Sequence, residues 1–403
     1  MLLDRPLAAS SPIATPSSIT VPPIRARIVL STHAQPPSES VSVRRVSRPR
    51  DQSFCVTPST VTMVRQQLTL QLAARESIRR QGLLSAFINA GIRSPVSLNR
   101  AGPVPGAPVS LDREMAAALS CLITRTAMPF EKTVALWRGE TAEDPRPNKA
   151  LDPQWLDILL HGYSLRQHVV AAVSHSFILP RPHDASPMDN HGSAQRYNAA
   201  LERSLADGQL AGTSFGCVPK KDIDPELEAR LIHNLSFLEG LSINALSSQH
   251  ELPAIEFESV RRLAIRIEEL AARYPTLCIK MLKGDVKGAF KHIPVSWHLS
   301  LPFGWTGSPA HYCAFGGGIS FLVARESPSS LSPAHDDTEP FFSFVWVDDH
   351  VLIEVDRGDR LELAESALRL SMLAMLGPRA INDKKFSAWE RSSTRSVSYG
   401  TRG

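Results

Sequence analysis

The chain has 403 residues, with 44 Lys and Arg against 40 Asp and Glu, which gives a formal net charge of +4. At about 150 residues per domain this length allows two or three domains, and the mildly basic balance permits a polyanionic partner without requiring one. Its five cysteines are far apart and lack C-x-x-C spacing, which argues against a disulfide-stapled secreted protein and a structural zinc protein. No signal peptide and no run of about 20 apolar residues is visible, so we expect an intracellular protein, in the nucleus or cytoplasm, without a membrane partner.

Residues 1–60 are dominated by Pro, Ser, Thr and Val and have no lasting apolar period. Such a segment buries too little apolar surface to offset its ordering entropy, so we predict a disordered tail. Arg44, Arg45, Arg48 and Arg50 form a loose basic cluster there. The cluster is either a nuclear-import or nucleic-acid-contacting patch or, as we favour, part of a solvated tail.

Residues 61–185 are predicted to form a helical region whose role the sequence does not indicate. Apolar residues recur at helical spacing over 62–90, and a Pro/Gly-rich break follows at 102–108. Two further helical stretches are expected near 111–138 and 153–179, with a turn at 144–147 between them.

Residues 186–403 differ from the preceding region, because strand-like and helix-like sequence patterns both occur in them. We expect, in chain order, a helix at 193–210, strands at 215–219 and 231–235, a helix at 260–274, a strand at 277–282 and a hairpin over 341–355. The predicted fold class is therefore α+β.

One candidate site residue is Asp285, which ends the apolar strand and is followed five residues later by Phe290. On its own this pattern is weak, because an Asp at a strand end is more often a helix cap or turn former.

A second acidic site is the pair Asp348-Asp349, which lies between two apolar strand-like runs and predicts a hairpin with acids at its tip. An ordinary polar turn is the plain alternative. Adjacent carboxylates beside a core repel each other unless a cation neutralises them, and such hard oxygen ligands suit Mg²⁺. Together with Asp285 they would hold two metal ions about 3.5–4 Å apart, the arrangement that clamps an in-line phosphoryl displacement.

Between the acids, the segment Leu301–Pro309 reads LPFGWTGSP. Two glycines and two prolines around aromatic residues predict a rigid loop that another flat molecule can approach closely, although a structural turn is an equal alternative.

Taken in order, these three segments resemble the palm of a reverse transcriptase. Asp285 with Phe290 is similar to the first polymerase motif, Leu301–Pro309 to the second, and Val347-Asp348-Asp349 to the third, x-D-D on a hairpin. Upstream, the segments 218–222 and 230–236 resemble the fingers of these enzymes. Downstream, 377–378 and 381–386 are similar to the fourth motif, which has an Asn and a Lys after a helix. The resemblance covers roughly residues 190–390, and the residues within the motifs are most similar to those of retrotransposons of the DIRS-like group.

The resemblance implies a reverse-transcriptase fingers and palm with an antiparallel palm sheet, and an RNA-directed DNA polymerase that transfers a nucleotide to a primer 3′-hydroxyl. It implies that Asp285, Asp348 and Asp349 bind two Mg²⁺ (or Mn²⁺) ions, with the carbonyl of Val286 as a further ligand. The implied partners are an RNA or DNA template-primer and dNTPs.

The resemblance also implies a nucleotide-binding set. The basic members, which would neutralise the triphosphate or protonate the leaving group, are Lys220, Lys221, Arg230, Lys384 and Lys385. The others are Phe290, which would exclude a 2′-hydroxyl, and Phe303, Gly304 and Trp305, which would pack against nucleotide and template.

The chain departs from the family pattern in two places. Pro302 follows Asp285 by only 17 residues (302 − 285), where the family has a helix, a turn and a further strand. The chain stops soon after Lys385, so we expect the thumb to be missing or incomplete. The alternative function is therefore a catalytically inactive, truncated relative that at most binds nucleic acid. A third possibility, an RNA-templated RNA polymerase, is disfavoured by Phe290 and by Val347 before the Asp pair.

Overall fold

The computed structural model describes residues 57–99, 112–180, 192–199, 202, 215–219, 224, 229–236, 242–255, 258–296, 300–331 and 334–391. Four groups of predictions lie wholly or mostly outside these residues: the tail with its arginine cluster, the Pro/Gly-rich break, the helix at 193–210, and the roles of Lys220 and Lys221. Residues 58–60, the end of the expected tail, belong to the first helix instead. All described residues belong to one compact unit, Gln52–Gly403.

Five helices form the first part of this unit. They are α1 (Pro58–Asn89), α2 (Arg113–Thr126), α3 (Phe130–Arg138), α4 (Pro153–Leu159) and α5 (Arg166–His175). A short 3-10 helix, η1 (Val96–Asn99), follows α1. Each of the two long helices expected after α1 is a pair of shorter ones. The first is interrupted where Ala127 adopts a φ of 49° before Pro129, and the second where Gly162 adopts a φ of 89°.

Two short strands come next, β1 (Phe215–Pro219) and β2 (Ala229–His233), which pair antiparallel with Val218 opposite Arg230. β1 has the expected bounds, whereas β2 begins and ends two residues earlier than the strand expected at 231–235. Shorter elements flank them, namely α6 (Gly192–Arg196), α8 (Ile243–Leu246) and η2 (Gln249–Glu251). The amphipathic helix α9 (Arg261–Arg273) lies where the sequence predicts it.

A four-stranded antiparallel sheet carries the acidic residues. Its order is β4 (Ser343–Trp346), β5 (Asp349–Val355), β3 (Ile279–Asp285) and β6 (Glu390–Arg391). Between β3 and β4 lie η3 (Ala289–His292), α10 (Gly307–Arg325) and α11 (Pro328–Leu331), and α12 (Arg360–Leu376) follows β5. The expected α+β class is confirmed.

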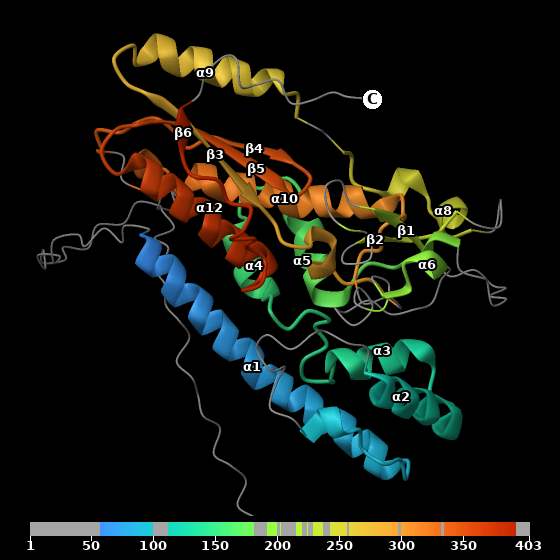
Figure 1. Cartoon of the computed structure of the whole chain (residues 1–403). Coiled ribbons are helices and arrows are strands. Elements are labelled where there is room, and N and C mark those ends of the chain that lie inside the picture. The colour runs from blue at the N-terminus through green and yellow to red at the C-terminus, as the bar shows by residue number, and fades with distance from the viewer. Residues whose placement is uncertain are drawn as a thin grey trace, which may run out of the picture. The chain divides into compact units, whose positions relative to one another are not determined.

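Helices cover both faces of this sheet, as Figure 1 shows. Because side chains alternate along a strand, Leu352 of β5 packs in the core that contains α10 and α12. Its neighbours Val351 and Ile353 pack against α9 on the other face. β5 is therefore buried on both sides, which fixes its register and the position of Asp349 at its first residue.

The sheet shares its core with α4 and α5. Leu160, which caps the end of α4, and Val173 of α5 are fully buried in the same cluster as Phe315 and Leu352. Apolar residues from both sides of residue 185 therefore share one core. A second cluster, which joins the end of α1 to α2, contains Leu83, Phe87, Met115 and Leu122. Within the described residues, no helix combines the length and apolar composition that a membrane crossing requires.

The short interval after Asp285 is compact. Its described residues, 286–296, contain the single 3-10 turn η3, and Val295 forms an isolated parallel bridge with Phe177. The part that the structure describes contains neither a longer helix nor a full strand between Asp285 and Val295.

Candidate functional site

The three aspartates gather at one end of the sheet. Asp285, the last residue of β3, pairs in register with Asp349, the first residue of β5. Residues that oppose each other in an antiparallel pair project to the same face, with their Cβ atoms about 5 Å apart. The backbone N–H of Val286 donates to the carbonyl of Asp348 at 2.9 Å, which holds the hairpin turn against the end of β3.

The hairpin turn is strained. Trp346 pairs with Asp349, so Val347 and Asp348 form a two-residue connection, and Val347 has a φ of 53°. A β-branched residue in this region is an outlier that costs about 1–3 kcal/mol, and such positions gather at functional sites. The helix α10 comes close here, because a Cβ built on Gly316 would lie 3.7 Å from the carbonyl oxygen of Val347.

The carboxylate of Asp285 is buried and accepts two hydrogen bonds. Its side chain is 3% exposed; Asn382 Nδ2 donates to one oxygen at 2.5 Å and Lys385 Nζ to the other at 2.9 Å. Across the ladder, Lys283 Nζ lies 2.7 Å from Asp349 Oδ2. Two ammonium groups therefore neutralise two of the three acids.

The segment that carries Asn382 and Lys385 runs along β3 as an added edge. Ile381 bridges Val286, and the Ser387 N–H donates to the carbonyl of Lys283 at 2.9 Å. Gly284 allows this approach, because a Cβ there would lie 2.8 Å from Cζ of Phe386. The sequence placed Asn382 in the fourth motif without giving it a site role, although an Asn and a Lys after a helix were the available signal.

Negative charge accumulates around Asp348. Burial raises the pKa of the Asp348 carboxyl, and the charges of Asp349 and Asp285 raise it further, whereas Lys385 opposes them. The hydrogen bond to Asp285 raises the pKa of Lys385 in turn, so this lysine stays charged. The acids therefore repel one another with only partial neutralisation, and an added cation at this end of the sheet would be stabilised.

This donor set fits a divalent cation in its chemistry, because ionised carboxylates are the hard oxygen ligands that Mg²⁺ and Mn²⁺ prefer. As the side chains stand, no three His, Cys, Asp or Glu groups of the described residues are arranged as metal ligands. The oxygens of Asp285 accept instead from Asn382 and Lys385, and Asp349 pairs with Lys283. Rotation of the Asn382, Lys385 and Lys283 side chains away from these carboxylates would free their oxygens to bind a metal ion.

The loop expected over 301–309 is shorter than predicted, because α10 already begins at Gly307. Ser308 Oγ donates to the carbonyl of Pro302 at 2.7 Å and closes the loop onto the helix. Gly304 has a φ of 103°, and a Cβ there would lie 2.3 Å from the carbonyl oxygen of His233. The N–H of His233 donates to Phe303 O at 2.9 Å, so the loop lies directly against β2.

The aromatic residues of the predicted nucleotide set differ in exposure. Phe303 is 47% exposed, whereas Phe290 is 8% and Trp305 4% exposed. The rings of Phe290 and Phe303 lie 4.9 Å apart between centroids. Trp305 Nε1 donates to Ser247 Oγ at 2.8 Å, so this residue anchors the loop. Phe303 is thus the member of the loop best placed to contact another molecule.

Asn244 also holds the loop, and the sequence did not single it out. Its Nδ2 donates to Gly304 O at 2.8 Å, and its Oδ1 accepts from Thr306 N at 3.0 Å. Asn244 lies in α8, 60 residues before Gly304, and no local sequence pattern predicts such a contact. The loop is therefore positioned by β2 and α8 as well as by its own glycines.

The basic residues of the predicted set are less well defined. Arg230 pairs with Val218 in the β1–β2 ladder. Lys384 is exposed, and Lys385 is the one lysine of the set that bonds to an aspartate within the described residues. Lys287, just before η3, and Lys291, within it, are also exposed and extend the positive charge near the acids.

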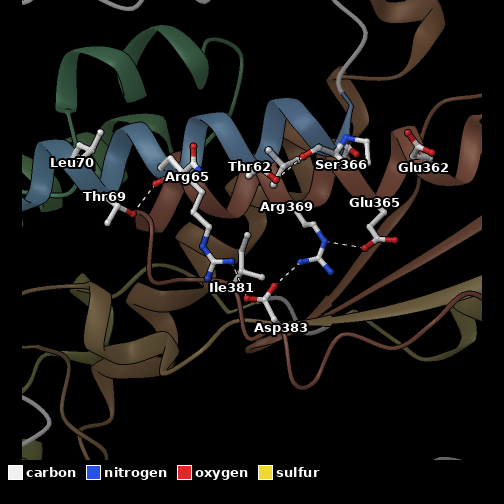
Figure 2. A pocket seen from close by; sticks show the side chains of 13 residues that line it. Thr62, Arg65, Thr69, Leu70, Glu362, Glu365, Ser366, Arg369, Ile381 and Asp383 are labelled. Carbon is white, nitrogen blue, oxygen red and sulfur yellow. Dashed lines mark hydrogen bonds and ion pairs between the residues drawn. The ribbon is translucent and has the colours of Figure 1, made fainter. Parts of the chain in front are cut away.

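A groove of about 790 Å³ lies between α1 and α12, and its lining contains none of Asp285, Asp348 and Asp349. Figure 2 shows Arg65 of α1 and Arg369 of α12 pointing toward Asp383 from two sides. The arginines contact the two oxygens of this carboxylate at 2.8 and 2.9 Å. Because Asp383 directly follows Asn382, the two helices help to hold the segment that bonds to Asp285.

No protein-family model matches the chain, and no curated protein is significantly similar to it.

Proposed function

We propose that this chain is an RNA-directed DNA polymerase of retroelement ancestry, built as the fingers and palm of a reverse transcriptase and similar to the DIRS-like group. The observation that carries the proposal is the register of β3 and β5, which sets Asp285 opposite Asp349 beside the strained turn that holds Asp348. The acids of the first and third motifs thus lie at one end of an antiparallel sheet, and Phe303 of the second motif contacts Phe290 of the first.

In this proposal Asp285, Asp348 and Asp349 hold two Mg²⁺ or Mn²⁺ ions, with the carbonyl of Val286 as a further ligand. Bound there, the ions would activate a primer 3′-hydroxyl and neutralise the leaving pyrophosphate. Lys385 and Lys283, which now pair with the carboxylates, would turn toward the phosphates of the incoming nucleotide.

The remaining residues bind and orient the substrate. Phe303 provides an exposed ring beside Phe290, which suits a flat base and a sugar that lacks a 2′-hydroxyl. Arg230, Lys220, Lys221 and Lys384 would meet the triphosphate. The exposed lysines beside η3 supply a positive field for a template-primer backbone.

A second candidate function is a silent relative that binds nucleic acid without polymerising it. It is favoured by the lysine ammonium groups that already pair with Asp285 and Asp349. It is also favoured by the short interval after Asp285, whose described residues contain only the 3-10 turn η3. A small displacement in such a site, of about 1 Å, lowers the rate by about 100-fold.

Primer extension on an RNA template with dNTPs and Mg²⁺ separates the two functions. We expect extension by the unchanged chain and a loss of at least about 100-fold in Asp285→Asn, Asp348→Asn and Asp349→Asn. Asp356→Asn is the matched control, because Asp356 follows β5, is exposed and pairs only with Lys280 among the described residues. Extension with NTPs but not dNTPs would indicate an RNA polymerase instead.

Absence of extension by folded, unchanged chain in both Mg²⁺ and Mn²⁺ would refute the enzyme. Retained binding of an RNA–DNA hybrid in the same sample would then support the silent relative.

A further inference from the structure

The hydroxyl of Tyr312 is buried and has no hydrogen-bond partner among the described residues. A buried tyrosine hydroxyl usually has a hydrogen-bond partner, so a hydroxyl without one needs an explanation. Tyr163, in the connection between α4 and α5, is the contrasting case, because its hydroxyl donates to the carbonyl of Ala314 in α10, the helix of Tyr312, at 2.9 Å. Tyr312 therefore holds a donor that the fold itself does not use.

Tyr312 lies between the first motif and the hairpin turn. Its ring meets that of Phe290 edge-on, with centroids 5.7 Å apart. On the other side, a Cβ built on Gly316 would lie 3.7 Å from Cε1 of Tyr312 and 3.7 Å from the carbonyl oxygen of Val347. The gap between the Tyr312 ring and the turn that carries Asp348 is thus about the size of one small side chain.

The charges of the three aspartates affect the pKa of this hydroxyl. Burial raises the pKa of Tyr312 well above its usual range, and Asp348 contributes more to that rise than Asp285 or Asp349. The hydroxyl therefore keeps its proton, and among the three acids Asp348 influences it most.

Tyr312 cannot touch a nucleotide, because its side chain is 0% exposed. It can act only through another group of the protein. An ionised carboxylate accepts about four hydrogen bonds on two oxygens, so one oxygen can bind a cation while the other accepts from a donor.

We propose that Tyr312 is a positioning residue for Asp348: when a divalent cation binds one oxygen of the Asp348 carboxylate, the other oxygen accepts a hydrogen bond from the Tyr312 hydroxyl, which has no partner among the described residues as the side chains stand. The proposal rests on the proposed function, since it requires a metal at the aspartates. Donors behind a metal ligand fix its orientation, and their removal weakens metal binding by about 10–100-fold.

The test measures Mn²⁺ binding to the full chain by the electron paramagnetic resonance signal of the free ion, together with the thermal midpoint without metal. We expect Tyr312→Phe to weaken Mn²⁺ binding by about 10–100-fold, with a thermal midpoint that is unchanged or higher because an unpaired donor is gone. The matched control, Tyr163→Phe, should lower the midpoint, because it loses a formed hydrogen bond, and leave Mn²⁺ binding unchanged.

Extension assays add a kinetic readout. In Tyr312→Phe the Mg²⁺ concentration for half-maximal rate should rise by about the same factor, while KM for dNTP at saturating Mg²⁺ stays unchanged.

Each remaining outcome decides the matter. If Mn²⁺ binds the unchanged chain and Tyr312→Phe equally but not Asp348→Asn, the metal site stands and the role of Tyr312 is overturned. If the unchanged chain binds no Mn²⁺, the role of Tyr312 and the proposed function fall together. If Tyr163→Phe weakens Mn²⁺ binding as much as Tyr312→Phe does, the effect is general destabilisation and the proposal fails.

Discussion

Gly304 is the position where one added methyl group should do the most damage to the loop beside the site. Alanine there would place its Cβ 2.3 Å from the carbonyl oxygen of His233, which belongs to β2 and cannot rotate away as a flexible side chain would. The φ of 103° is also unfavourable for any residue with a Cβ. Both effects act on the loop that packs directly against β2.

The expected loss in free energy of unfolding is the sum of two effects. A non-glycine residue at such a φ costs about 1–3 kcal/mol. Relief of the clash requires the loop to move off β2, which breaks the bond from His233 N to Phe303 O. The same movement disturbs the two bonds that Asn244 makes to the loop, and each hydrogen bond is worth about 1 kcal/mol. With all three bonds lost, we expect a total loss of about 4–6 kcal/mol.

Urea denaturation of Gly304→Ala and Gly162→Ala measures this difference directly. Gly162 has a φ of 89°, but a Cβ there would meet only the ring of Phe321 at 3.8 Å, an ordinary contact. The control therefore carries the conformational cost without the clash and should lose about 1–3 kcal/mol. Equal losses in the two variants would refute the reasoning, because they would show that β2 and the loop separate at no cost.

Three further predictions concern charge. Lys385→Met should lower stability by about 0.5–1.5 kcal/mol in metal-free urea denaturation, because Lys385 is largely exposed, and millimolar MgCl₂ should restore it if the carboxylates bind metal. His350 is fully buried without a partner among the described residues, and burial lowers its pKa to about 3. The folded form stays neutral while the unfolded form gains a proton below about pH 6.5. From about pH 7.5 to about pH 5.5, the unchanged chain should therefore lose about 1.4 kcal/mol relative to His350→Leu. Arg360→Met should cost about 3–5 kcal/mol, because it leaves the buried Glu354 without its main partner.

Each of these has an outcome that contradicts it. Failure of MgCl₂ to restore Lys385→Met would argue against a metal at Asp285. A His350→Leu variant with the same pH dependence as the unchanged chain would mean that His350 is not buried neutral. Arg65→Met is the control for Arg360→Met, since Arg65 pairs with the exposed Asp383 and should lose less than about 1 kcal/mol.

The sequence was most informative where a pattern is local. The end of a strand at Asp285, the hairpin around Asp348 and the helix over 260–274 all follow from alternation or helical spacing in one window, and the structure contains each of them. Interruptions were harder to place. The helix break before Pro129 and the start of α10 at Gly307 depend on how neighbouring elements pack, so periodicity alone carried one helix through its break and did not predict α10.

Contacts between distant segments were beyond prediction. Asn382 reaches Asp285 across 97 residues, and Asn244 reaches Gly304 across 60. Such pairs are brought together by the sheet and its helices, and neither residue type is unusual in its own surroundings. The free donor on Tyr312 was equally invisible, because a tyrosine in an apolar helix reads as an ordinary core residue.

The core that α4 and α5 share with the sheet has a consequence for synthesis of the chain. Gly307, where α10 begins, follows His175, where α5 ends, by 132 residues (307 − 175). At about 5–20 residues per second, the ribosome needs roughly 7–26 seconds to deliver the apolar partners of these two helices. During that time the faces of Leu160 and Val173 have no sheet to cover them. Nascent chains of this length should bind chaperones, and release of folded protein should wait for α12.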